Sequence, residues 1–125
     1  MPATTYFENL VLDHALRQQP FSVANWYVGL WTANPTAAGL LTGEVTAVDY
    51  QRQPVVWDTA FGNTSLVGWS AALNDWGDIT YVCVLNSPTK ATGNMLGFQI
   101  EDPSLDANPG VTIEIQAGAL NWNVI

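Results

Sequence analysis

The chain has 125 residues, a length that suits one domain with a core of its own. Its formal net charge is −8, and its three cations, Arg17, Arg52 and Lys90, are far apart in the sequence. Binding of nucleic acid or of an anionic membrane needs clustered cations, so we expect neither as a partner.

The N-terminal segment has the pattern of an amphipathic helix. Thr5 and Glu8 have the spacing of a capping box, in which both side chains accept hydrogen bonds from free amides at a helix start. Apolar residues follow at helical spacing until Pro20, so we predict a helix over residues 6–18. Its apolar stripe fits the domain's own sheet or a neighbouring subunit, and the first of these is favoured.

Short strands are predicted through the middle of the chain. Residues 25–32 are rich in Trp and Tyr without a helical period, which favours a strand. Residues 50–57 form the next strand, in which Pro54 indicates a sheet edge or a bulge. Residues 37–48 have no period, and a loop of this length is usually functional or ordered by assembly. A short strand is predicted over residues 65–69.

The most apolar stretch predicts a buried hairpin. Residues 79–85 are apolar or β-branched at nearly every position, which is typical of a central strand covered on both faces. The turn-forming residues 86–93 lead to a second strand that Gly97 interrupts. Residues 101–110 predict an acidic loop, and strands over residues 111–115 and 120–124 complete the chain.

These elements predict a mainly β protein. One N-terminal α-helix precedes six or seven short strands at regular spacing, which is typical of an antiparallel β-sandwich or small barrel. We find no internal repeat and no linker. The prediction is a single domain over residues 1–125, with residues 1–20 as a helical arm and residues 21–125 as the sandwich.

Groups that could carry out chemistry are few. His14 is the only histidine and lies on the helix stripe, where a packed or interface role is favoured. Cys83 is the only cysteine and lies in the most apolar run, which favours a buried, unreactive thiol. One His and one Cys cannot supply the usual zinc ligands. We therefore expect no enzyme, no metal site and no cofactor.

The acidic residues form two groups in the sequence. Solvated side chains are favoured over a calcium loop or a carboxylate pair for glycoside hydrolysis, because the spacing matches no compact calcium loop. These residues are Asp75, Asp78, Glu101, Asp102 and Asp106.

The six tryptophans permit two interpretations. Exposed Trp26, Trp31 or Trp57 could stack on sugar rings, as in a carbohydrate-binding module. A core or interface role is favoured, because a domain this short uses large aromatic residues for packing.

The chain has no signal-peptide pattern and no apolar run of the ~20 residues that a membrane span needs. We therefore expect a soluble protein made in the cytoplasm, which leaves the cell only as part of an assembled particle.

Six ordered blocks resemble a family of small virion proteins of tailed bacteriophages, often called tail-fibre-like proteins. They are NLVLDHALR (9–17), WYVGLWTANPT (26–36), YQRQPV (50–55), DWGDIT (75–80), TGNML (92–96) and IEIQAGAL (113–120). Residues 37–49 and the acidic segment 101–109 depart from the family pattern, and we expect partner choice to be encoded there.

The resemblance implies a structural protein located in the virion. A capsid decoration or cement protein that binds between capsomers and stabilises the shell is favoured. A tail-fibre or baseplate component that contacts the host surface is the alternative, and a non-viral carbohydrate-binding module is a second one.

We expect the contacts in the helix and in residues 33–49, because chain ends and long loops can reach neighbours. The expected partners are the major capsid protein or tail proteins of the same virion, with a homotrimer favoured by analogy. The predicted contact residues are Tyr6, Phe7, Leu10, His14, Trp31, Pro35, Leu40, Leu41 and Trp57.

Overall fold

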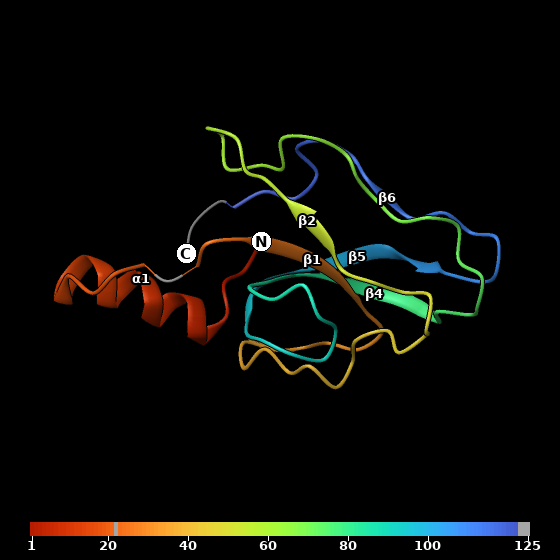
Figure 1. Ribbon diagram of the computed structural model, residues 1–125, viewed down its shortest axis with the longest axis horizontal. Helices are drawn as coiled ribbons and strands as arrows, with labels where there is room; N and C mark the ends of the chain where they lie inside the picture. The colour runs from red at the N-terminus through yellow and green to blue at the C-terminus, as the bar shows by residue number, and fades with distance from the viewer. Residues whose placement is uncertain (22, 123–125) are drawn as a thin grey trace.

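The computed structural model describes residues 1–21 and 23–122 of the chain. It confirms a mainly β fold with one N-terminal helix and antiparallel sheets (Figure 1). The elements are α1 (Thr5–Arg17), β1 (Trp26–Trp31), β2 (Gln53–Val55), β3 (Val67–Gly68), β4 (Asp78–Leu85), β5 (Met95–Asp106) and β6 (Glu114–Ile115).

The helix α1 begins one residue earlier than predicted. Its N-cap is Thr4, whose Oγ1 accepts a hydrogen bond from the Phe7 amide at 3.3 Å. The prediction of a capping box that begins at Thr5 was therefore wrong. Thr4 is fully buried, and its hydroxyl also donates to the carbonyl of Met95, so the cap residue is fixed by its contact with β5 as well as by the helix. Gln18, in the left-handed conformation, ends the helix.

Four strands form the main sheet in the order β2-β1-β4-β5. The interior position of β4 confirms the predicted central strand, and β2, which contains Pro54, lies at an edge as expected. The segment before α1 covers the start of β5, since the amide of Thr4 donates to Leu96 and the amide of Phe98 donates to Pro2. A Cβ at Gly97 would lie 2.3 Å from the Trp122 ring, so glycine is required there.

The strand β5 is longer than predicted. The prediction of an acidic loop over residues 101–110 was wrong for residues 101–106, because pairing with β4 resumes after an irregular stretch, with Leu105 opposite Ile79 and Asp106 opposite Asp78. The sequence pattern missed this half because it lies at a sheet edge exposed to solvent, where charged residues and a proline are common.

The strands β3 and β6 form a second, two-stranded antiparallel sheet. They are shorter than the predicted strands over residues 65–69 and 111–115. Near the chain end, Asn121 makes a single bridge with Gly62. The end of the predicted closing strand, residues 123–124, which includes Val124, lies outside the described residues. The described strands form two separate sheets, and no closed barrel.

Both faces of the main sheet are covered. A larger core joins residues of the two sheets, among them Val28, Val84, Val67 and Ile115. On the opposite face, Trp31, Cys83, Leu85 and Met95 form a smaller core, and Leu41 from the loop between β1 and β2 packs on it. Within the described residues, no helix is long and apolar enough to span a bilayer.

The loop between β1 and β2 is fixed by a buried ion pair. Arg52 Nε and Nη2 each lie 2.8 Å from an oxygen of Glu44, and both residues are nearly inaccessible to solvent. Tyr50 donates to the same carboxylate, while Arg52 Nη1 donates to the carbonyls of Ser87 and Thr92 at 2.9 Å. The ion pair therefore joins this loop to the β4–β5 connection.

Candidate assembly surface

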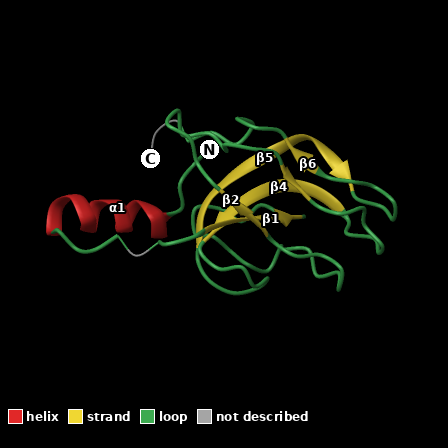
Figure 2. Ribbon diagram, turned by 45° about the horizontal axis from the view of Figure 1, so that its top comes forward, coloured by secondary structure: helices red, strands yellow, loops and turns green. Residues whose placement is uncertain are grey.

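The helix α1 extends past the end of the sheet and does not lie across it (Figures 1 and 2). Its first two turns contact the body, with Phe7 buried and Tyr6, Leu10 and Val11 packed against the larger core. The second half is different, because Leu12 is 53% exposed and Leu16 is 77% exposed. We call α1 the arm.

Five aromatic rings connect the arm to the body, and we call them the aromatic joint: Phe7, Phe21, Trp26, Trp57 and Trp122. Phe7 meets Trp26 edge to face at 5.7 Å and Trp122 at 5.1 Å between ring centroids. Edge-to-face contacts of this kind add to the free energy gained from burying the rings. The joint thus fixes the base of the arm.

The predicted contact residues are divided between core and surface. Leu40 and His14 are exposed; Tyr6, Leu10, Leu41 and Trp57 are half-buried; Phe7, Trp31 and Pro35 are buried. His14 Nδ1 donates to the Gln19 carbonyl at 2.9 Å, which helps to end α1.

Trp31 is corrected to a core residue. Its side chain has no exposed surface to offer a partner, and its indole nitrogen donates to the Leu40 carbonyl at 2.9 Å. The loop over residues 37–48, which was expected to be functional or ordered by assembly, is likewise tied to the body through Trp31 and the Glu44–Arg52 pair.

No tryptophan ring is highly exposed. Trp31, Trp69 and Trp76 are buried, and Trp26, Trp57 and Trp122 are half-buried within the aromatic joint. The rings named as sugar-stacking candidates therefore already pack against other rings or lie in the core. This arrangement favours the packing interpretation of the tryptophans.

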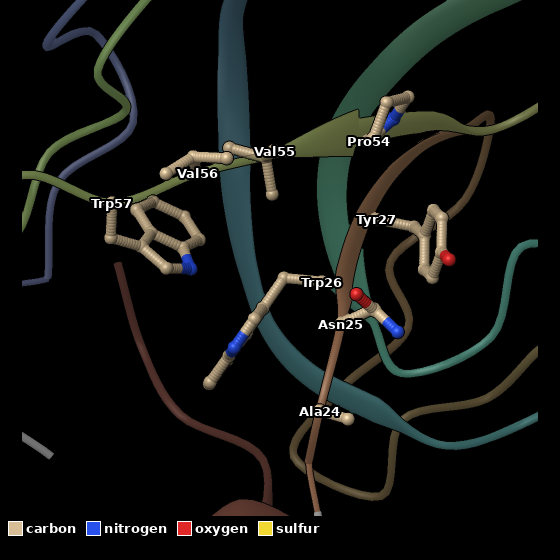
Figure 3. A pocket seen from close by; sticks show the side chains of 8 residues that line it. All are labelled: Ala24, Asn25, Trp26, Tyr27, Pro54, Val55, Val56 and Trp57. Atoms are coloured by element: carbon tan, nitrogen blue, oxygen red, sulfur yellow. The ribbon is translucent and has the colours of Figure 1, made fainter.

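Two hollows flank the edge strand β2. Figure 3 shows the first, of about 350 Å³, between Trp26 and Tyr27 of β1 and residues 54–57. The second, of about 330 Å³, lies between β2 and β3, where Leu66 and Val67 line it. Both share Pro54, Val55 and Val56. No charged residue lines either one, although the chain carries a net charge of −8.

Two of the side chains that line these hollows are apolar and accessible, beside polar ones such as Asn25 and Gln53. Val56 is 70% exposed and Leu66 is 47% exposed. An exposed apolar side chain beside a neutral hollow is a feature of protein contact surfaces. We call the two hollows with these side chains the β2 surface.

Two titratable groups, Cys83 and Asp49, have pKa values that their surroundings shift. Burial, followed by the charge of Glu44, raises the pKa of the Cys83 thiol, which disfavours the reactive thiolate. The hydrogen bond from the Asn74 amide, with those from the Leu73 amide and the Trp76 indole, holds the pKa of Asp49 well below its usual range.

Three of the five acidic residues weighed as a metal or catalytic group accept hydrogen bonds. Asp75 accepts from the Gly77 amide, Asp78 from the Ser104 hydroxyl and Asp106 from the Asn108 amide. In residues 1–21 and 23–122, no three His, Cys, Asp or Glu side chains lie close enough to hold a metal ion.

Sequence reasoning did not select four exposed apolar side chains as contacts. Leu12 and Leu16 belong to the predicted helix, from which other residues were selected. Val56 and Leu66 carried no signal, since single apolar residues in short strands point to either face.

Comparison with known proteins identifies a family to which the chain is similar. The model of the family described as podophage GP4 fiber I protein gp80 matches residues 2–123. No curated protein matches the chain.

Proposed function

Because the chain belongs to the family of podophage GP4 fiber I protein gp80, we propose that this phage structural protein has no enzymatic role and is attached to the particle through its arm. The observation that carries the proposal is the exposure of Leu12 and Leu16 on a helix that extends away from the body. A helix of 13 residues is marginally stable in water by itself, so contact with a neighbouring protein would stabilise its outer half.

The favoured location is the capsid surface. In this role the protein binds the major capsid protein between capsomers, as a homotrimer, and stabilises the shell. Support comes from the shape, because a small body with one short arm is suited to lie on a surface. Many copies of a modest contact would together strengthen a shell.

A tail location is the second candidate, and the printed description of the family as a fiber protein favours it. In this role the partners are tail proteins of the same virion, and an exposed part of the body contacts the host surface. The arm then attaches the protein to the tail or baseplate.

Counting copies in purified particles separates the two locations. A decoration protein should be present in on the order of hundreds of copies, as symmetry-related capsid positions require. A phage without the gene should still adsorb to its host, and its capsids should break at lower temperature. A few copies per particle and failed adsorption would instead favour the tail.

Arm variants test attachment itself. Particles that lack the protein should rebind the wild-type chain, and Leu12→Gln with Leu16→Gln should weaken rebinding at least tenfold, as expected when two leucine contacts are lost. A change at Leu73, which is equally exposed on the body, is the control and should rebind normally. Equal rebinding by the arm variant would contradict the proposal.

A further inference from the structure

We propose that the arm of one copy binds the β2 surface of a second copy, with Leu12 and Leu16 entering the two hollows beside β2. This inference rests on the proposed function. It takes the neighbouring protein that covers the outer half of α1 in the particle to be a second copy of the chain, and it names the surfaces that form the contact. The arm offers the two exposed leucines, and the β2 surface offers two neutral hollows of about 350 and 330 Å³.

The spacing of the leucines suits paired hollows. Leu12 and Leu16 are four residues apart, so they lie on one face of α1, about 6 Å apart along the axis. The two hollows are adjacent to each other, since both are lined by Pro54, Val55 and Val56. Each has room for one leucine side chain.

Charge selects the second copy as the occupant. Two chains of net charge −8 repel each other wherever their acidic surfaces meet. The outer half of α1, residues 12–17, limits this cost, because the charges of Asp13 and Arg17 lie 3.5 Å apart and offset each other. The acid Glu8, which has no ion-pair partner among the described residues, lies one turn nearer the body. The β2 surface has no charged lining residue. Contact between these two neutral regions is therefore the approach with the least repulsion.

The two surfaces cannot meet within one chain. The aromatic joint fixes the base of α1, and the helix extends past the end of the sheet, so its outer half lies away from β2 (Figures 1 and 2). Contact between different surfaces of identical chains is heterologous. It produces a closed ring when the rotation permits and an open chain when it does not. A ring of three copies is the form that fits the proposed homotrimer.

Light scattering of the wild-type chain over a range of concentrations tests this contact. We expect reversible association into a closed species, strengthened by added salt because salt screens the repulsion between acidic chains. Leu12→Gln with Leu16→Gln on the arm, or Val56→Glu on the β2 surface, should each weaken association at least tenfold. Val48→Glu and Leu73→Gln change comparably exposed side chains elsewhere and should leave association unchanged.

Mixing the variants distinguishes this contact from others. The arm variant keeps an intact β2 surface, and Val56→Glu keeps an intact arm, so an equimolar mixture should form dimers although neither variant associates alone. Circular dichroism and native protection of the Cys83 thiol would verify that both variants fold.

Three outcomes would overturn the inference: a wild-type chain that stays monomeric, normal association of Val56→Glu, or a mixture that forms no dimer. If the wild-type chain is monomeric while the arm variant fails to rebind particles, the arm binds another virion protein. In that case the proposed function is retained and the proposed contact between copies is rejected.

Discussion

The carboxylate of Asp49 joins two loops through the hydrogen bonds that it accepts. It accepts hydrogen bonds from the Leu73 amide at 2.7 Å, the Asn74 side chain at 2.9 Å and the Trp76 indole at 3.1 Å. These donors favour the charged form, which lowers the pKa of Asp49 in the folded protein. The stabilisation is therefore present above the unfolded pKa of about 3.9 and is lost as pH falls below it.

We predict that Asp49→Asn lowers the free energy of unfolding at neutral pH and has a smaller effect in acid, where the wild-type carboxylate is protonated too. Urea unfolding at several pH values measures this difference. Asp58→Asn is a suitable comparison, since Asp58 also accepts backbone hydrogen bonds. A stability difference between Asp49→Asn and the wild-type chain that does not change with pH would contradict the assigned role.

Arg52 gives a second prediction at this scale. Arg52→Met should destabilise the fold by about 3–5 kcal/mol, because it leaves the buried Glu44 charge without its partner. Arg52→Lys should restore only part of this loss, since an ammonium cannot make the paired contacts of a guanidinium. Combining Arg52→Met with Glu44→Gln should cost less than the sum of the two changes, and strict additivity would argue against the ion pair.

At the scale of elements, the two halves of α1 have different roles. Phe7→Ala should lower the free energy of unfolding by about 3–5 kcal/mol, because Phe7 is buried in the aromatic joint. Leu16→Ala should change it by less than about 0.5 kcal/mol in the isolated chain, because Leu16 makes little contact there. Thermal unfolding of both variants measures the contrast. A large loss for Leu16→Ala would mean that the arm folds back onto its own body.

Elements with a strong local pattern could be predicted from the sequence. The strand β4 was recognised because apolar residues on both faces require cover, and the edge position of β2 followed from Pro54. The second half of β5 could not be recognised, because its pairing with Asp78 and Ile79 is a long-range contact that leaves no periodicity in polar edge residues. The shift of the helix cap to Thr4 also depends on a distant partner, Met95.

The candidate site was predictable only in outline. The N-terminal helix was selected as a contact region, yet which half is exposed depends on how far it extends past the sheet. Trp31 has the residue type of an interface anchor, and only its packing under Leu41 identifies it as core. The partner of Arg52 was also invisible, since Glu44 lies in a loop without a pattern.

The whole molecule has an acidic net charge and two surface regions without net charge. The net charge of −8 disfavours contact between acidic surfaces, whereas the outer half of α1 and the β2 surface can meet without like charges facing each other. Assembly is then favoured only where neutral regions meet, which gives the contact a defined orientation. The same separation of charge would allow the proposed close contact in spite of the acidic net charge.

A cryo-EM reconstruction of the intact particle tests the central claim most directly. We expect density for α1 against a neighbouring protein chain, with Leu12 and Leu16 buried in the contact. A well-resolved copy whose arm extends into solvent, with both leucines uncovered, would contradict it.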